Sequence, residues 1–257
     1  MPLISVVTSV YNGEAYLKEC VDSVLNQTFQ DFEYIILNNG STDGTAEILS
    51  QYTEPRLQIV HQENQGLSRS LNKGIHMASS ELIARLDADD FSNPYRLEKQ
   101  INFMNQHPEI VLCGSQFKVL LGMDYIDNPT HGLEDDESIR KSMSCFNPFA
   151  HSTVVFRKAA FIKSGGYREK FKFGQDYDLW SRILDFGEAY ILRNELSTIR
   201  LQELSTSSKN SKAIRIEGLQ IRWNAFKKFG GNPVEALYHF LKSMIGLYTP
   251  PKSPFKK

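Results

Sequence analysis

Short apolar runs in the first part of the chain alternate with segments whose apolar residues recur at helical spacing. Turn residues separate the two kinds of segment, as in a chain that alternates strand and helix. Successive units of this kind place their strands parallel in one sheet and their helices on its faces. The sequence therefore predicts an α/β fold with a mostly parallel sheet and helices on both faces. The expected strands are residues 3–7, 34–37, 57–60 and 82–86, and a later one is 153–156.

Three of these strands have polar or aromatic residues just past their ends. Tyr11 follows the first, Asn38 and Asn39 follow the second, and Asp87 follows the fourth. In open α/β sheets, ligands bind beyond the carboxyl ends of the strands. A ring for stacking, two amides for base or ribose edges and a carboxylate for a phosphate-bound metal suit a nucleoside diphosphate.

Three carboxylates crowd into four residues after the fourth strand, at Asp87, Asp89 and Asp90. Like charges this close repel one another, and a hard divalent cation such as Mn²⁺ or Mg²⁺ neutralises them through oxygen ligands. The same residues also suit a solvated acidic loop, or a cap for a helix that begins near Asn93-Pro94. Their spacing alone does not separate these interpretations.

The other candidates also have structural interpretations. Tyr11 would pack under a helix, and Asn38-Asn39 would form a turn, because Asn tolerates left-handed backbone conformations. Asp176 begins a short amphipathic segment, where a carboxylate either caps the helix or acts as a general base. His151 follows Asn147-Pro148-Phe149, and a lone histidine of this kind is more often structural than catalytic.

Composition limits the class of protein. The 257 residues suffice for one large α/β domain with an appendage, and Cys20, Cys113 and Cys145 are too dispersed for a disulfide framework or a zinc site. The apolar run at the N-terminus is too short for a signal sequence or a membrane span. We therefore expect a cytoplasmic protein with one catalytic domain.

The net charge of −1 conceals an uneven distribution. Residues 209–257 contain ten Lys or Arg and two Asp or Glu, a net charge of +8, whereas residues 1–208 contain 19 and 28, a net charge of −9. The expected organisation is a catalytic domain over 1–208 and a basic C-terminal helical extension over 209–257.

Two helices are expected in this extension. The segment Asn232-Pro233-Val234-Glu235 offers an N-cap, a proline at the first position and an acid at the third. The helices either pack on the catalytic domain or contact a membrane surface or a partner. Near an anionic leaflet each Lys or Arg would contribute about 1 kcal/mol. Nucleic acid is not expected, because no binding motif accompanies the charge.

Six short motifs follow one another along the chain. They are Ile4 to Asn12; Gln27-Thr28-Phe29; Asn39 to Asp43; Asn64 to Ser68 with Leu71 to Ile75; Ile83 to Asp90; and Gly165-Gly166-Tyr167 leading to Asp176 to Trp180. In this order they resemble the family 2 inverting glycosyltransferases, over residues 4 to about 207. The resemblance implies a GT-A fold, which is Rossmann-like, plus a C-terminal helical segment, and a role in bacterial cell-surface polysaccharide assembly.

The resemblance also implies roles for residues of this chain. Asp176 matches the catalytic base, and Asp87-Ala88-Asp89 matches the DxD motif, whose last carboxylate holds the metal while the first contacts the nucleotide. Tyr11 matches the ring that stacks on the base, and Asn39 the position that reads the base edge. The implied nucleotide-sugar contacts are Thr8, Tyr11, Asn38, Asn39, Asp87 and Asp89, and the implied ligands of Mn²⁺ or Mg²⁺ are Asp89 and Asp90.

Three positions depart from the pattern of the family. Asn38-Asn39 replaces a pair of aspartates, Gln175 replaces an acid, and Gln202 stands where a histidine often assists the metal. An amide donates as well as accepts hydrogen bonds, and it is a poor metal ligand. Base preference and metal affinity are therefore expected to differ from those of the family pattern.

The reaction that the resemblance implies is sugar transfer from a nucleotide-sugar donor, first of all a UDP-sugar, to a glycan or lipid-linked acceptor. The transfer would be a metal-assisted single displacement with inversion, in which Asp176 deprotonates the acceptor hydroxyl. The basic extension would allow peripheral contact with the inner face of the membrane. Two alternatives are a glycosyltransferase-like nucleotide-binding scaffold with little turnover, and a nucleotidyltransferase, which would need a Gly-rich basic loop near the first strand.

Overall fold

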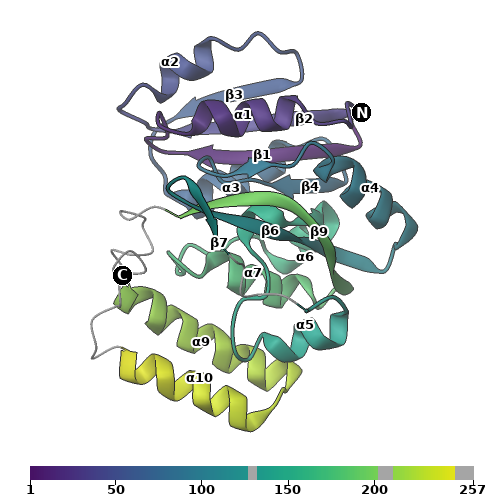
Figure 1. Cartoon of the computed structure of the whole chain (residues 1–257), viewed down its shortest axis with the longest axis vertical. Helices are drawn as coiled ribbons and strands as arrows, with labels where there is room; N and C mark the ends of the chain where they lie inside the picture. The colour runs from purple at the N-terminus through teal and green to yellow at the C-terminus, as the bar shows by residue number, and fades with distance from the viewer. Residues whose placement is uncertain (127–131, 202–210, 247–257) are drawn as a thin grey trace.

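The computed structural model describes residues 1–126, 132–201 and 211–246 (Figure 1). Within these residues nine strands form one sheet in the order β3-β2-β1-β4-β8-β6-β9-β5, with β7 paired to β6. The strands are β1 (Ile4–Val10), β2 (Phe32–Asn39), β3 (Leu57–Gln62), β4 (Leu82–Arg85), β5 (Phe91–Ser92), β6 (Ile110–Leu121), β7 (Asp124–Ile126), β8 (Val155–Arg157) and β9 (Glu188–Leu201). The helices are α1 (Leu17–Leu25), α2 (Thr45–Ser50), α3 (Leu67–Met77), α4 (Arg96–Gln106), α5 (Asp136–Ser142), α6 (Lys158–Ser164), α7 (Gln175–Ile183), α9 (Ser211–Phe229) and α10 (Pro233–Gly246).

The predicted alternation of the first four strands and three helices is confirmed, and these strands are parallel. β1, β2 and β4 are buried on both sides because the sheet separates two hydrophobic cores, whereas the edge strand β3 is only partly buried. Val6 of β1 faces one core, which α1 and α4 complete, and Val7 faces the other, to which α3, α6 and α7 contribute. A strand buried on both faces has a continuous apolar sequence, as these runs do.

The second half of the sheet is mixed. β8 lies antiparallel between β4 and β6, whereas β6 and β9 are parallel. The strand expected at residues 153–156 begins later, at Val155, because His151–Thr153 form a 3₁₀ turn. The Thr153 N–H donates to the Ala150 carbonyl at 3.0 Å, and the Thr153 hydroxyl donates to the same oxygen at 2.8 Å.

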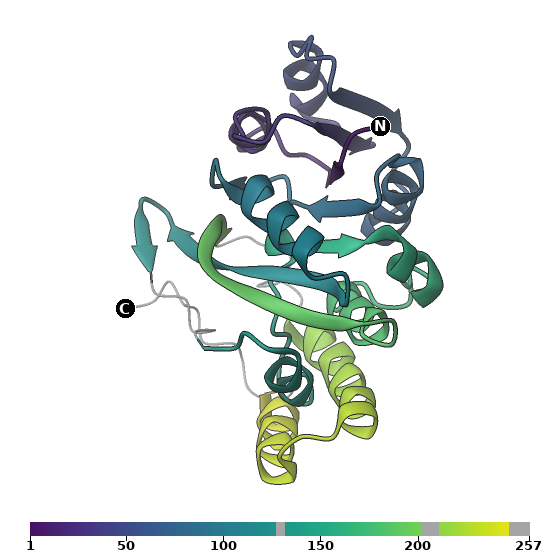
Figure 2. The ribbon, with the colours of Figure 1, turned by 90° about the vertical axis from the view of Figure 1, so that its right-hand side faces the viewer.

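The C-terminal helices differ in how they join the molecule. Both views place α9 and α10 together at the end remote from β3 (Figures 1 and 2). Ile221 and Ala225 of α9 are buried in the core that α7 shares, whereas α10 packs on α9. The predicted start of α10 is confirmed, since Asn232 Oδ1 accepts the Val234 N–H at 3.0 Å. The expected division after residue 208 falls outside the described residues.

No helix in the described part of the chain is both long enough and apolar enough to cross a membrane.

Phe156 of β8 is fully buried, with its ring stacked on Phe161 at 5.6 Å and tilted against Trp180 at 5.9 Å between centroids. Phe156→Ala should lower the free energy of unfolding by about 3 to 5 kcal/mol, because it removes this burial and leaves a cavity. Urea denaturation measures the loss. Phe186→Ala is the matched control, since that ring is 41% exposed, and should cost clearly less. Equal losses would contradict the packing described here.

Candidate active site

The polar residues that follow the parallel strands do meet at one edge of the sheet. Val10 at the end of β1 pairs with Asn38 of β2, and β4, which precedes Asp87, lies on the other side of β1. Tyr11 follows β1 at the same edge. The predicted convergence is therefore confirmed, and it comes from the parallel register.

The two adjacent asparagines are buried and hydrogen-bonded within the protein. Asn38 Oδ1 accepts the Ser41 N–H at 3.2 Å. Asn39 Oδ1 accepts Gln62 Nε2 at 2.9 Å and the Gln65 N–H at 3.0 Å. Both asparagines end β2 in extended backbone, and Gly40 has the positive φ of the turn, so the expectation that Asn38-Asn39 form the turn is wrong, although their side chains bond to it. A nucleobase that donates to Asn39 Oδ1 would share this oxygen with the Gln62 and Gln65 donors.

Tyr11 and Thr8 differ sharply in exposure. Tyr11 is 54% exposed, so it does not pack under a helix and its ring is open to a stacking partner. Thr8 is completely buried; its hydroxyl donates to the Leu86 carbonyl at 2.8 Å and lies 3.0 Å from Tyr34 Oη. The Thr8 hydroxyl is therefore bonded within the sheet, and the nucleotide contact expected of Thr8 stays a prediction.

Asp87 is partly exposed and is paired with a buried arginine. The guanidinium of Arg85, 0% exposed, contacts Asp87 Oδ1, while Ser152 Oγ donates to Asp87 Oδ2 at 3.3 Å and accepts the Asp87 N–H at 3.0 Å. Burial opposes ionisation, but the charge of Arg85 outweighs it, with a contribution from the Ser152 hydrogen bond, and holds the pKa of Asp87 below its usual value. Asp87 is therefore a fixed, ionised carboxylate.

Asp90 is buried and hydrogen-bonded within the protein. It is 5% exposed; its Oδ1 accepts the Arg200 N–H at 2.9 Å and its Oδ2 contacts Ser152 Oγ. Burial, with the charges of Asp87 and Asp89, raises its pKa well above the usual value. These partners replace the helix cap that Asp90 was expected to form, while the role of Asp90 as a metal ligand stays a prediction.

Asp89 is more accessible to solvent than Asp90. It is partly exposed, and burial together with the charge of Asp87 raises its pKa to about 6. A cation beside Asp89 would relieve this repulsion. In the described part of the chain no three His, Cys, Asp or Glu residues are grouped to hold a metal ion. Asp89 with Asp87 beside it therefore fits Mn²⁺ or Mg²⁺ shared with a diphosphate, not a cage made by the protein alone.

Asp176 lies in the first turn of α7, with its carboxylate held from two sides. Its Oδ1 accepts the Tyr177 N–H at 2.7 Å, and its Oδ2 accepts Asn147 Nδ2 at 2.9 Å. Gly174, not Asp176, occupies the N-cap position of α7. Burial raises the pKa of Asp176 to about 6, and the charge of Asp87 adds to the increase against these hydrogen bonds. Asp176 is thus ionised at neutral pH but unusually basic.

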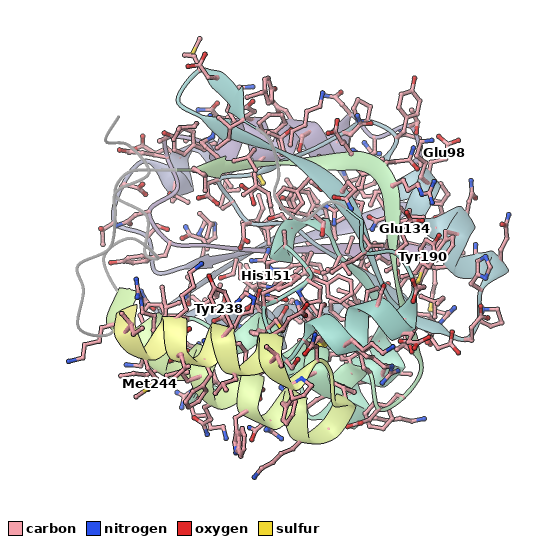
Figure 3. All side chains as sticks on the ribbon, turned by 60° about the horizontal axis from the view of Figure 1, so that its bottom comes forward. Glu98, Glu134, His151, Tyr190, Tyr238 and Met244 are labelled. Carbon is pink, nitrogen blue, oxygen red and sulfur yellow. The ribbon has the colours of Figure 1, made fainter. Side chains whose placement is uncertain are left out.

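His151 connects Asp87 to an aromatic cluster in the middle of the molecule (Figure 3). Its Nε2 lies 2.7 Å from Tyr167 Oη, its Nδ1 lies 3.6 Å from Asp87 Oδ2, and its ring meets Trp180 edge-on. Burial and Arg85 lower the pKa of His151 to about 3, against the opposite effect of Asp87. A neutral, buried imidazole here fits the structural interpretation.

Sequence reasoning missed several residues that shape the site. Arg85 could have been noticed, because a charged residue interrupts the apolar strand just before the acidic cluster. Asn147, Ser152 and Arg200 gave no such signal, since their partners lie 29 to 110 positions away in the sequence. Gln202, the proposed substitute for a metal-assisting histidine, lies outside the described residues.

Comparison with known proteins agrees with this arrangement. The sequence model of "Glycosyl transferase family 2" matches residues 5–163. The chain belongs to glycosyltransferase family 2. Among curated members, it is 33% identical over 257 residues to the O-antigen biosynthesis glycosyltransferase WbnJ of Escherichia coli, covering 95% of this chain and 98% of WbnJ. It is 32% identical over 197 residues to the amylovoran biosynthesis glycosyltransferase AmsE of Erwinia amylovora, covering 72% and 71% of the two chains.

Solved structures share the GT-A fold. S. aureus TarS (1–349), crystallised with UDP-GlcNAc, matches with a TM-score of 0.73 at 18% identity, covering 94% of this family 2 chain and 71% of that one. Mannosyltransferase PcManGT of Pyrobaculum calidifontis, in complex with GDP-Man and Mn²⁺, matches with a TM-score of 0.66 at 17% identity, covering 98% and 77%. The predicted fold class is confirmed.

The different environments of Asp89 and Asp90 generate a test of the metal assignment. Asp89→Asn should weaken Mn²⁺-dependent UDP binding by about 10-fold or more, because it removes the accessible carboxylate. Asp90→Asn should keep affinity within about 3-fold, because an amide can still accept from Arg200 and meet Ser152. Calorimetric titration of UDP with Mn²⁺ or EDTA measures both. A larger loss for Asp90→Asn than for Asp89→Asn would identify Asp90 as the ligand.

Proposed function

We propose that this family 2 glycosyltransferase moves a sugar from a nucleotide-sugar, with UDP-sugars as the first donors to test, to a glycan or lipid-linked acceptor with inversion. The observation that carries the proposal is Asp176, a basic carboxylate held by Asn147 within electrostatic reach of Asp87. A single displacement needs a base on one side of the sugar and a site for the leaving diphosphate on the other. In this proposal Asp176 is the base, and the diphosphate leaves on the side of Asp87.

The proposed reaction forms one bond and breaks one. The acceptor oxygen attacks the anomeric carbon as its proton passes to Asp176, and the bond from that carbon to the diphosphate oxygen breaks. Attack opposite to the leaving group inverts the configuration. A bound Mn²⁺ or Mg²⁺ would neutralise charge on the departing nucleoside diphosphate. In this proposal Asp89 and Asp87 hold the metal and nucleotide, Tyr11 offers its exposed ring to the base, and Asn39 contributes an amide edge.

The relatives support the donor class. The TarS structure contains UDP-GlcNAc and the PcManGT structure contains GDP-Man with Mn²⁺, and WbnJ and AmsE are named for polysaccharide synthesis. Family membership disfavours the nucleotidyltransferase alternative. One observation favours the scaffold alternative: the Asn39 carbonyl, which would read the base, is already bonded to Gln62 and Gln65.

Asp176→Asn tests catalysis directly. It should lower kcat by about 10²-fold or more, because an amide cannot take the acceptor proton, while UDP affinity stays near that of the wild type. In the wild type, kcat/KM should fall about tenfold per pH unit below about pH 6, since protonation of Asp176 removes the base. Release of UDP from UDP-sugars, measured against pH, reports both effects.

Asp31→Asn provides the matched control for this test. Asp31 is exposed just before β2, at the opposite edge of the sheet, so its variant should turn over normally. Turnover by Asp176→Asn at the wild-type rate would remove the base assignment. Nucleotide binding by the wild type without release of UDP from any sugar donor would favour the scaffold.

We further propose peripheral contact with an anionic membrane, through the outer face of α10. Large apolar residues on this face are at least half exposed, an unusual surface for a helix in water. Residues 209–257 carry a net charge of +8, which disfavours a second copy against this face and favours anionic lipid. Tyr238 and Met244 mark the helix in Figure 3. The exposed residues are Val234, Leu237, Tyr238, Leu241 and Ile245.

Flotation with phosphatidylglycerol liposomes tests this contact. The double variant Leu237→Glu/Leu241→Glu should bind at least about 10-fold more weakly than wild type, because it charges the apolar face. Gln220→Glu/Asn224→Glu adds the same charge at exposed polar positions of α9 and should lose much less. Equal flotation of the two variants would contradict the proposal. Removing the whole extension is a poor test, because α9 belongs to the core.

A further inference from the structure

A carboxylate from the C-terminal extension holds the turn that leads into α7. Glu217 of α9 accepts three successive backbone N–H groups: Oε1 accepts that of Lys172 at 3.0 Å, and Oε2 accepts those of Phe173 and Gly174, both at 2.9 Å. Successive N–H groups that point to one site form a concave anion-binding arrangement. Here a side chain more than 40 positions later in the sequence occupies that arrangement.

Packing presses α9 against the same turn. Ile221, one helical turn beyond Glu217, is buried, and a Cβ built on Gly174 would lie 2.6 Å from its Cδ1 atom. The same Cβ would lie 3.7 Å from Glu217 Oε2. A side chain at residue 174 would therefore force the Ile221 side chain to shift. The contact combines charge-assisted hydrogen bonds with close apolar packing.

This turn determines where Asp176 lies. The Gly174 carbonyl accepts the Asp178 N–H at 2.9 Å, which closes the first turn of α7 around Asp176. Gly174 has no side chain with which to cap the helix, so nothing of its own fixes the start of α7. Glu217 is the charged group that anchors the turn, and Asn147 holds the Asp176 carboxylate from the opposite side.

We propose that Glu217 is a positioning residue, so that α9 of the basic extension completes the active site of the GT-A domain. The proposal rests on the role of Asp176 as the base. A base must sit within hydrogen-bond reach of the acceptor hydroxyl, and a displacement of about 1 Å can cost about 100-fold in rate. Loss of the Glu217 hydrogen bonds would make the turn less ordered and Asp176 less precisely placed. The nucleotide site at the ends of the strands would not change.

The test uses Glu217→Ala and Glu217→Gln in the full chain. Glu217→Ala should lower kcat for UDP release from UDP-GlcNAc and other UDP-sugars by about 10- to 100-fold, with the Kd of UDP unchanged. Glu217→Gln should lie between Glu217→Ala and wild type, because one amide oxygen can still accept. Glu235→Ala, an exposed glutamate of α10, is the control for loss of one negative charge and should match wild type. Unchanged kcat in Glu217→Ala would overturn the proposal.

A double-mutant cycle separates positioning from general stability. If Glu217 acts through Asp176, Glu217→Ala should add almost nothing to the loss caused by Asp176→Asn. Equal losses in the two backgrounds would mean a structural role only and overturn the proposal. If Asp176→Asn itself turns over normally, the proposed base has failed, and not the contact of Glu217.

Hydrogen exchange gives a readout that does not need turnover. Amides in a peptide spanning residues 172–178 should exchange faster in Glu217→Ala than in wild type, because their acceptor is gone. Exchange in the α1 segment 17–25 should stay unchanged and serves as the internal control. Wild-type exchange rates at 172–178 in the variant would overturn the proposal even if the chain showed no turnover.

Discussion

A buried arginine under the acidic loop is the interaction on which the candidate site depends. Arg85 ends β4 with no exposed surface, pairs with Asp87 and donates to the Val7 carbonyl at 3.2 Å. A buried cation needs an anion nearby, and the clustered carboxylates need a cation, so each group makes the other tolerable. Asp87 is thereby fixed as an ionised group. Burial and the charge of Asp87 raise the pKa of Asp89 to about 6, and in our proposal Asp89 holds the metal.

The acidic loop is also held by strands from the far end of the chain. Arg200 of β9 donates its N–H to Asp90, and its Nε donates to the Asp89 carbonyl at 3.2 Å. Glu217 of α9 does the same for the turn before Asp176. Segments late in the chain thus position both the acidic loop and the turn before Asp176. Helix α9 of the extension packs as part of the same body as the preceding domain. The outer helix of the extension, α10, packs on α9, and in our proposal it contacts the membrane.

The sequence predicted the first half of the fold better than the second. Continuous apolar runs identified β1 to β4, and their parallel order brought Tyr11, Asn39 and Asp87 to one edge. The antiparallel insertion of β8 between β4 and β6 left no local signal, because it depends on pairing across more than 40 positions. The 3₁₀ turn that delays β8 was missed for a similar reason, since a Thr hydroxyl bond to a carbonyl is invisible in an apolar pattern.

The sequence by itself determined which chemical groups stand at the strand ends and that family 2 motifs occur in order. Periodicity and local turn chemistry are properties of neighbours in the chain, so they can be read without the fold. Only the tertiary structure decided which groups stay open to a ligand. It buried Thr8 and Asp90, left Tyr11 exposed, and brought Asn147 to Asp176 and Glu217 to the turn before it. Burial and long-range hydrogen bonds depend on packing, and packing sets both exposure and pKa.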